Sequence, residues 1–541
     1  MKDISSTGSF VDFTLENFIY VDKTVYIPQL VKLKRVFISR PRRFGKSLTL
    51  DTIATLFETG VEPYFKGTWI YDKWTEPTYP VLRLNFLNFD KNSLEKFNNK
   101  LNSKITEFAE LNKVTTYKEK EEAEDSIDHL LEQLRLEGRQ IVILIDEYDC
   151  QMTANINNET LYKQFQEKIK SFYANIKDKF AIKFLGITGV TRLKDVSIFS
   201  VGSDINDITN ASAYSQMIGF TRDEIKKYYI DYLKLASSYE NNCSVDDVTD
   251  TQLESMLDMM AQNYDGYCFD EDYEKKVFST WSVNKFFQTM IEKKKVQFGE
   301  YWYDNGGLPS ILVNYLKTHE LNIFEYLDKD KFLKVSSDDF KNPTALTTIN
   351  QNVLMCQTGY LTLRSDLNKT STVALGIPNG EIYKALNRLL ANNIFKGNTD
   401  ITDDYGRSLL EVGTVDDIIN LFNSALNSVS YDNYPIVSES SVQNMLKLYL
   451  LGAHQEVLSE VHEAKGRADL VVNTDNRRIV FEFKYAKNEA EAKSKLSEAV
   501  EQIKTRDYGN ILPKKNELIR IAAVFNADPK VRAFTENQIV P

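Results

Sequence analysis

The segment Arg42-Arg43-Phe44-Gly45-Lys46-Ser47 combines residue types that can hold a phosphate group. It ends in the Gly-Lys-Ser of the P-loop pattern GxxxxGK[ST], where glycine lets the backbone approach phosphates and helix N–H groups point at the anion. Lys46 would reach the β- and γ-phosphates, and the hydroxyl of Ser47 would bind Mg²⁺. We therefore predict an ATP and Mg²⁺ site that also includes Leu48.

The first position of this pattern holds Arg40 instead of glycine. With Arg42 and Arg43, Arg40 would add positive charge near the nucleotide. A Gly-Lys-Ser sequence alone also occurs in ordinary surface turns, so a second signal is needed.

The second signal is an apolar run, Ile141 to Ile145, that ends in two carboxylates about a hundred residues later. Asp146 is placed to hold Mg²⁺ through water or Ser47, and Glu147 to polarise the attacking water. Alone, Asp146-Glu147 fits a solvated strand end equally well. The two signals together, in this order and each after an apolar run, favour a nucleoside triphosphatase.

A third polar group, Thr188-Gly189-Val190-Thr191-Arg192, follows another apolar run. Thr188 is the candidate that would sense the γ-phosphate, with Arg192 as a weaker one. A loop threonine and a surface arginine with structural roles are the open alternative.

A separate group of charged residues lies near the C-terminus. In Val480-Phe481-Glu482-Phe483-Lys484 the strand alternation puts Glu482 and Lys484 on one face, and Asp469 starts the neighbouring predicted strand. Asp469 and Glu482 offer hard oxygen ligands for Mg²⁺ or Mn²⁺, and Lys484 would orient water or neutralise a phosphodiester oxyanion. Glu460 could add a carboxylate. The alternative is a cross-strand salt bridge on a sheet face.

The elements that would position these groups follow from hydrophobic spacing. Short apolar runs at residues 34–39, 80–87, 141–146 and 181–187 alternate with helical patterns, which predicts a mostly parallel sheet with helices on both faces. Residues 221–426 have mainly helical spacing. A second α/β unit is predicted from a helix at 442–451, strands at 468–472 and 478–484, a helix at 489–504 and a strand at 518–525. We divide the chain into domains at 1–220, 221–430 and 431–541.

Composition limits the class of protein. The chain has 541 residues, enough for several cores, and a net charge of −11, which argues against non-specific coating of nucleic acid. Residues 460–541 carry 15 basic and 13 acidic residues, so this part could approach a phosphate backbone. Four scattered cysteines argue for a reducing cytoplasm and against structural zinc. We predict a cytoplasmic protein without a signal peptide or a membrane span.

Further strings lie along nearly the whole chain. They are Tyr20-Val21-Asp22-Lys23-Thr24, Arg40-Pro41-Arg42-Arg43-Phe44-Gly45-Lys46-Ser47-Leu48, Leu144-Ile145-Asp146-Glu147-Tyr148-Asp149, Ile187-Thr188-Gly189-Val190, Ser197-Ile198-Phe199-Ser200, Tyr264-Asp265-Gly266-Tyr267, Gln357-Thr358-Gly359-Tyr360-Leu361, Leu375-Gly376-Ile377-Pro378-Asn379, Gly466-Arg467-Ala468-Asp469, Phe481-Glu482-Phe483-Lys484, and Gln502-Ile503 followed by Tyr508. With these strings the chain resembles a bacterial family of AAA-ATPase-like proteins with a C-terminal PD-(D/E)XK nuclease-superfamily domain.

The resemblance implies a P-loop ATPase domain of the AAA-like type, a helical middle region and a restriction-endonuclease-like α/β domain. It implies nucleotide binding by Lys46 and Ser47, Mg²⁺ and hydrolysis roles for Asp146 and Glu147, and sensing by Thr188. It also implies metal-dependent phosphodiester chemistry at Asp469, Glu482 and Lys484. As the nucleic acid partner we predict DNA in preference to RNA.

Three functions stay open from the sequence. They are an ATP-coupled nuclease, a nucleotide-switched module whose C-terminal domain binds nucleic acid or protein without cutting, and a plain ATPase whose C-terminal carboxylates form salt bridges. The sequence does not indicate the oligomeric state.

Overall fold

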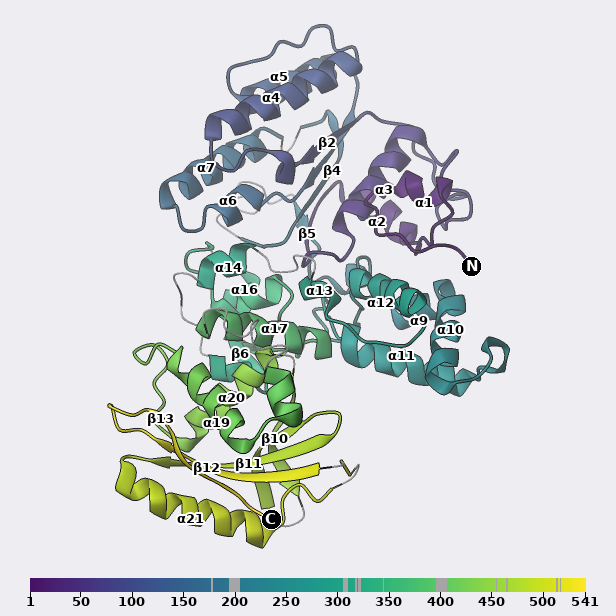
Figure 1. The fold of residues 1–541 in the computed structure, drawn as a ribbon. Helices are drawn as coiled ribbons and strands as arrows, with labels where there is room; N and C mark the ends of the chain where they lie inside the picture. The colour runs from purple at the N-terminus through teal and green to yellow at the C-terminus, as the bar shows by residue number, and fades with distance from the viewer. Residues whose placement is uncertain are drawn as a thin grey trace. The chain divides into compact units, whose positions relative to one another are not determined.

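The structure is a computed structural model that describes residues 1–176, 179–193, 205–304, 310–316, 319, 323–343, 345–395, 406–453, 455–463, 466–511, 514–515 and 517–541. It divides into two compact units (Figure 1). Unit 1 comprises Met1–Leu321 and Asp330–Ile382, and unit 2 comprises Asn322–Lys329 and Tyr383–Pro541. The string Ser197-Ile198-Phe199-Ser200 lies outside the described residues.

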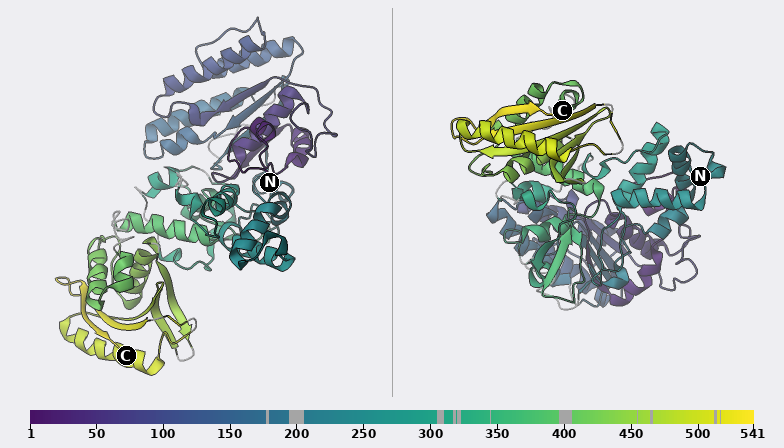
Figure 2. Two further views of the ribbon diagram at one scale, coloured as in Figure 1. Left: turned by 45° about the vertical axis from the view of Figure 1, so that its right-hand side comes forward. Right: turned by 90° about the horizontal axis from the view of Figure 1, so that it is seen from below.

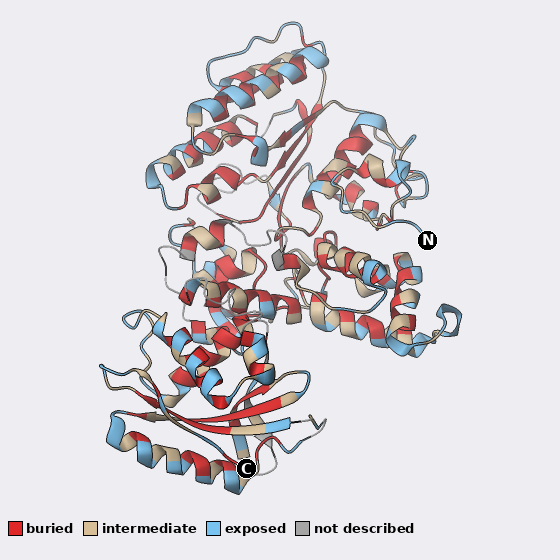
Figure 3. Cartoon of the chain, viewed as in Figure 1, coloured by how far each residue is buried: buried red, intermediate tan, exposed pale blue. Residues whose placement is uncertain are grey.

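Unit 1 contains a five-stranded parallel sheet. Its strands are β1 (Arg35–Ser39), β2 (Val81–Asn85), β3 (Ile141–Asp146), β4 (Ile182–Gly189) and β5 (Asn206–Asp207), in the order β2-β3-β4-β1-β5. Every residue of β3 is buried (Figure 3), as expected for an apolar strand covered on both faces. Because the sheet is parallel, the carboxyl ends of β1, β3 and β4 share one edge, where open α/β sheets bind ligands.

Helices cover both faces of this sheet (Figure 1). On one side lie α1 (Phe10–Leu15), α2 (Ile27–Leu33) and α3 (Lys46–Thr59), and on the other lie α4 (Leu94–Leu111), α5 (Ala123–Leu136), α6 (Cys150–Ala154) and α7 (Glu159–Ile176). The parallel sheet with helices on both faces is the predicted architecture. Helix α5 begins at Ala123, within the charged run 119–128.

The rest of unit 1 is mainly helical, as predicted. It contains α9 (Arg222–Tyr228), α10 (Ile230–Asn241), α11 (Asp250–Tyr264), α12 (Thr280–Lys293), α13 (Tyr301–Asp304), α14 (Ser310–Leu316), α15 (Ser337–Lys341) and α16 (Gln351–Gln357). An aromatic and aliphatic core that includes Tyr229, Leu257 and Phe287 joins α9 to α12. The sequence pattern did not predict a small sheet of β6 (Leu333–Ser336), β8 (Thr372–Gly376) and β7 (Thr362–Leu363).

Helix α17 (Gly380–Ile394) carries the chain into unit 2, where a five-stranded mixed sheet forms. Its strands are β9 (Glu456–Glu463), β10 (Gly466–Asn473), β11 (Arg477–Ala486), β12 (Glu517–Asn526) and β13 (Ala533–Ile539), in the order β13-β12-β11-β10-β9. Strands β11 and β12 are parallel and are connected through α21 (Glu489–Arg506). Helix α21 packs on one face, and α19 (Val415–Asn427) and α20 (Glu439–Gly452) lie on the other (Figure 2).

The strand alternation in β11 divides its side chains between these two layers. Phe481 contacts Phe422 of α19, whereas Val480 packs with Ala499 and Ile503 of α21. Glu482 follows Val480 by two residues and therefore belongs to the α21 face. Among the described residues, no helix is both long and apolar enough to cross a membrane.

Candidate functional site

The P-loop connects β1 to α3 at the carboxyl edge of the parallel sheet. Gly45 has φ +104°, a left-handed conformation that glycine adopts without steric cost, and α3 starts at Lys46. The ammonium group of Lys46 is buried and donates to the carbonyl oxygens of Arg40 (3.0 Å) and Pro41 (3.2 Å). The lysine thus folds back over the loop in which a triphosphate would lie.

Asp146 gathers three predicted site residues at the end of β3. Its carboxylate accepts hydrogen bonds from the hydroxyls of Ser47 (2.6 Å) and Thr188 (2.5 Å) and from the N–H of Glu147 (3.0 Å). Strand β4 lies between β1 and β3, which brings Thr188 next to Asp146. Thr188 is therefore linked to the P-loop indirectly, through the Asp146 carboxylate that also accepts from Ser47. The oxygens of Ser47 and Asp146 are hard donors of the kind Mg²⁺ prefers.

Glu147 is held in an unusual conformation beside the P-loop lysine. Its φ is +53°, which is uncommon for a residue with a side chain, and its carboxylate lies 3.6 Å from the ammonium of Lys46. Burial raises the pKa of Glu147, Lys46 opposes this effect, and the negative charges of Asp149 and Asp146 add to it. A carboxylate with a raised pKa is a stronger general base. Backbone strain of this kind is often found at functional sites.

Arg40 corrects one expectation. Its guanidinium is buried, donates to the carbonyl oxygens of Thr209 (2.6 Å) and Ser39 (2.9 Å), and lies 4.1 Å from the ring centroid of Phe269. Burial lowers its pKa to about 9. Arg40 therefore supports the loop through its guanidinium, and unlike Arg42 and Arg43 it does not line the cavity beside the P-loop. Positive φ occurs at Arg43 but not at Arg40, so the backbone does not require glycine there.

Arg43 and Phe44 reach the helical part of unit 1 with their side chains. The guanidinium of Arg43 lies 4.3 Å from the ring of Trp281, and the hydroxyl of Thr280 donates to the carbonyl of Arg43 (2.9 Å). Phe44 is buried with its ring 4.7 Å from that of Tyr267. Phe44 can therefore face a nucleotide mainly through its backbone. No local sequence pattern pointed to Trp281 or Thr280.

Arg192 was the weaker candidate for phosphate sensing. Its side chain forms an ion pair with Asp207 of β5, and its backbone N–H donates to the side chain of Gln357 (3.2 Å). These structural contacts account for Arg192. Asp149, whose role the sequence did not reveal, is buried and accepts from the N–H of Thr191 (2.6 Å), so it ties the ends of β3 and β4 together.

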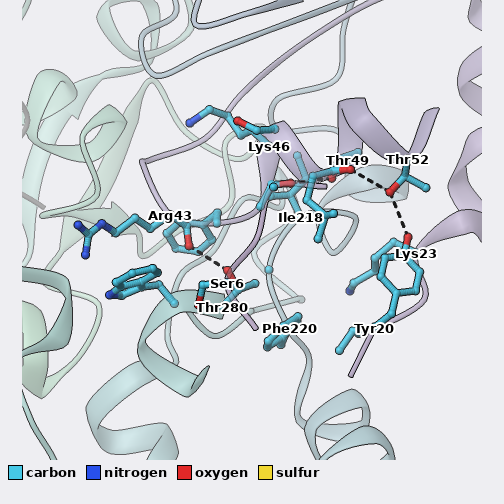
Figure 4. Close-up of a pocket in the computed structure, with 18 of the residues that line it drawn as sticks. Ser6, Tyr20, Lys23, Arg43, Lys46, Thr49, Thr52, Ile218, Phe220 and Thr280 are labelled. Atoms are coloured by element: carbon cyan, nitrogen blue, oxygen red, sulfur yellow. Dashed lines mark hydrogen bonds between the residues drawn. The ribbon is translucent and has the colours of Figure 1, made fainter. Parts of the chain in front are cut away.

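A cavity of about 540 Å³ opens beside the P-loop. Figure 4 shows Lys46 and Arg43 on one side of it and Tyr20 and Lys23 on the opposite side. Its lining includes the loop and helix residues Gly45, Lys46, Ser47, Leu48 and Thr49 with Glu147, and an apolar wall of Ile19, Val21, Ile27, Leu30, Met217, Ile218 and Phe220. Its size and mixed lining fit a nucleotide, with phosphates at the loop and the base against the apolar wall.

The second predicted site lies in unit 2 on β10 and β11. Glu482 is fully buried, and its Oε1 accepts from the ammonium of Lys484 (2.9 Å). The half-buried Asp469 accepts from the N–H of Phe483 (2.8 Å), so its carboxylate lies against β11 beside Glu482. The three residues are thus brought together.

Electrostatics at this cluster suit a cation. Burial and the charge of Asp469 raise the pKa of Glu482 to about 7, although Lys484 lowers it. The second oxygen of Glu482, Oε2, is buried without a hydrogen-bond partner in the described part of the chain. Asp469 and this oxygen would fit Mg²⁺ or Mn²⁺ as hard ligands. The described residues contain no group of three or more His, Cys, Asp or Glu arranged to hold a metal ion.

Four further residues bear on this site. Glu439, at the start of α20, was missed by the sequence reasoning, and its Oε1 lies 3.2 Å from the ammonium of Lys484. Tyr508 is fully buried below the sheet face, and Gln502 is half-buried on α21. The side chain of Glu460 lies outside the described residues.

The raised pKa of Glu482 predicts a pH-dependent stability difference. The folded carboxyl holds its proton up to about pH 7, whereas the unfolded one releases it near pH 4, so stability falls as pH rises through this window. At pH 5 the free energy of unfolding of Glu482→Gln should be close to that of the wild type. At pH 8 the variant should be more stable than the wild type by on the order of 2 kcal/mol. Thermal unfolding of the chelator-treated chain measures this difference. Glu489→Gln, at an exposed site, is the control and should show no pH-dependent difference in stability from the wild type. If Glu482→Gln changed the unfolding temperature equally at both pH values, the prediction would be wrong.

Comparison with known proteins places both clusters within recognised domains. A family model of a predicted AAA-ATPase matches residues 5–199, and a model of the PD-(D/E)XK nuclease superfamily matches residues 437–535. A relative from Azotobacter chroococcum mcd 1, named "uncharacterized protein in vnfD 5′ region", is 26% identical over 533 residues, 95% of this chain and 94% of the relative.

Two solved structures are also similar. A Walker-type ATPase of Pyrococcus abyssi is 11% identical with a TM-score of 0.35, over 69% of this chain and 96% of that one. Cdc6p from Pyrobaculum aerophilum is 10% identical with a TM-score of 0.22, over 68% of this chain and 91% of that one.

Proposed function

We propose that this chain, which matches a predicted AAA-ATPase model over residues 5–199 and a PD-(D/E)XK nuclease-superfamily model over residues 437–535, hydrolyses ATP in unit 1 and cleaves DNA phosphodiesters in unit 2. The observation that carries the proposal is the convergence of Ser47 and Thr188 on the carboxylate of Asp146 next to the P-loop. The three residues come from segments that are far apart in the sequence, and an ordinary surface turn would not require their side chains to converge.

In the ATP reaction, each residue has a separate task. Lys46 exchanges its contacts with the carbonyls of Arg40 and Pro41 for the β- and γ-phosphate oxygens. Ser47 and Asp146 would hold Mg²⁺, which supplies positive charge to the phosphates when bound. Glu147 accepts the proton of the attacking water, and its raised pKa suits that task. Thr188 orients the carboxylate of Asp146 and so connects β4 to the nucleotide.

In the nuclease reaction, Asp469 and Glu482 would hold Mg²⁺ or Mn²⁺, which activates water and offsets phosphate charge when bound. Lys484 keeps its ammonium near the Glu482 carboxylate, where it can orient the attacking water or stabilise the oxyanion. Burial lowers the pKa of Lys484, but the charges of Glu482, Glu439 and Asp469 raise it, and the net shift is upward. Lys484 therefore remains a cation, which favours charge stabilisation over proton transfer as its role.

The experiment uses the purified full chain with plasmid and linear DNA, with and without ATP, Mg²⁺ and Mn²⁺. ATP turnover together with metal-dependent cutting supports the proposal. Absence of both would overturn it. A parallel assay with RNA of the same sequence decides the preferred nucleic acid.

A second candidate function is a nucleotide-switched module that binds nucleic acid without cutting it. The specific observation in its favour is that Lys484 lies within ion-pair distance of both Glu482 and Glu439, an arrangement that could simply neutralise a buried carboxylate. Binding of DNA without cutting in any metal would favour this candidate.

The contact between Arg43 and Trp281 predicts a spectroscopic response to ATP. Phosphates bound at the P-loop should attract the guanidinium of Arg43. This should change the environment of the Trp281 indole, whose ring centroid lies 4.3 Å from the Arg43 guanidinium carbon. ATP titration should therefore change the intrinsic fluorescence, and Trp281→Phe should remove most of that change while ATP affinity varies by less than about threefold. Trp69→Phe, at an exposed indole, is the control. A full ATP response in Trp281→Phe would contradict the prediction.

A further inference from the structure

The C-terminal end of α21 places an arginine beside the nuclease-like cluster. Arg506 is in the last turn of α21, the helix that packs on the face of β11 to which Glu482 belongs. Its side chain passes Gly466 at the start of β10, three residues before Asp469. A Cβ atom at Gly466 would lie 2.6 Å from Cδ of Arg506 and 3.1 Å from Nε. Glycine at this position therefore leaves space for the arginine.

A buried tyrosine holds the guanidinium of Arg506. Nη1 of Arg506 donates to the hydroxyl of Tyr508 (2.6 Å). Tyr508 is fully buried, and its backbone carbonyl accepts from Nε of Arg520 (2.7 Å), so burial and this bond hold the tyrosine in place. The hydrogen bond uses one of five guanidinium N–H donors. Tyr508 is also the one hydrogen-bond partner that Arg506 has in the described part of the chain.

The surrounding negative charges favour a cation at the position of Arg506. The hydrogen bond to Tyr508 raises the pKa of Arg506, and the negative charges of Glu482 and Asp469 add to the effect. A phosphodiester brought to two carboxylates needs cations nearby, and Lys484 is already within ion-pair distance of Glu482 and Glu439. A half-exposed arginine with donors to spare fits a phosphate better than a lysine, because its planar fork can bind two oxygens.

We propose that Arg506, positioned by Tyr508, binds a backbone phosphate of the DNA strand that enters the Asp469–Glu482–Lys484 cluster. This inference rests on the proposed nuclease function. The simpler alternative is that Arg506 only stabilises the C-terminal end of α21 through the helix dipole and its contact with Tyr508. The two roles differ in what salt does to DNA affinity, because each phosphate contact releases about one counterion.

The test measures the affinity of the metal-free full chain for a duplex oligonucleotide at several salt concentrations. Arg506→Ala should weaken binding about tenfold and reduce the slope of log Kd against log salt by about one. Tyr508→Phe should keep most of the slope and weaken binding about threefold, because the arginine keeps its charge but loses its anchor. Lys504→Ala, at an exposed cation in the same helical turn, is the matched control and should change both quantities little.

The outcomes separate this inference from the proposed function. Wild-type cutting together with an unchanged slope in Arg506→Ala would overturn the role of Arg506 and leave the nuclease standing. An equal slope change in Lys504→Ala would also overturn it, because the charge effect would then be non-specific. A wild-type chain that neither binds nor cuts DNA would remove both proposals. Arg506→Lys should restore the slope but only part of the affinity, and its thermal unfolding checks that the fold is intact.

Discussion

Lys46→Ala should lower the affinity for ATP by about 100-fold or more and abolish hydrolysis. The ammonium of Lys46 is buried and donates hydrogen bonds to two loop carbonyls, so its positive charge lies where the phosphates would bind. Two charge-assisted hydrogen bonds to phosphate oxygens contribute about 3 kcal/mol or more, which corresponds to this loss in affinity. Calorimetric titration with ATP and Mg²⁺ measures the effect.

Controls for this variant must separate binding from folding. Removing Lys46 leaves the carbonyls of Arg40 and Pro41 without their donor and deprives Glu147 of a cationic neighbour, so some loss of stability is expected. Thermal unfolding without ATP reports that loss. Ser47→Ala, at an exposed position, should keep the fold and lose the enhancement of ATP binding by Mg²⁺. Lys32→Ala, an exposed lysine of α2, should bind ATP normally. Unchanged ATP affinity in Lys46→Ala would remove the P-loop assignment.

The parallel sheet and its site could be predicted because their signals are local. Strands β1, β3 and β4 are short, largely buried apolar runs, the pattern that a parallel sheet covered on both faces requires, and β2 at the sheet edge alternates buried Leu82 and Leu84 with exposed Arg83. The polar residues directly after these runs must then meet at one edge. This is why Ser47, Asp146 and Thr188, which come from three segments, lie within hydrogen-bond distance.

The behaviour of Arg40 could not be predicted in this way. Its partners Thr209 and Phe269 lie 169 and 229 positions further along the chain, so no local pattern shows that the guanidinium turns away from the loop. The same holds for the stacking of Trp281 on Arg43. The Arg-Pro-Arg-Arg-Phe string is thus explained by long-range packing as much as by phosphate chemistry.

In unit 2, the central strands were predictable and the edges were not. Strands β10 to β12 contain runs of buried apolar residues, whereas β9 and β13 are rich in polar residues and resemble loops in sequence. Strands at the edge of a sheet have one paired side and commonly carry polar side chains. Glu439 was missed for a related reason, since only the packing of α20 against the sheet brings it to Lys484.

Lys484→Ala should reduce metal-dependent DNA cleavage by about 100-fold or more, the usual cost of removing a group that stabilises a developing oxyanion. ATP affinity should stay unchanged, because the P-loop residues belong to unit 1. Nicking of supercoiled plasmid in Mg²⁺ and in Mn²⁺ gives the rate. Lys487→Ala, an exposed lysine three positions further along the chain, is the matched control and should cut at the wild-type rate.

The pH dependence of residual cutting distinguishes a catalytic lysine from a structural one. Lys484 lowers the pKa of Glu482, so its removal should raise that pKa further above 7 and keep the carboxyl protonated. A protonated Glu482 is a poor metal ligand, so residual activity in Lys484→Ala should appear only at higher pH than in the wild type. If higher pH restored the full rate, Lys484 would act only through the ionisation of Glu482. If the rate stayed low at every pH, Lys484 would act on the reacting phosphate itself. Wild-type cutting by Lys484→Ala at neutral pH would leave a salt bridge as the function of this lysine.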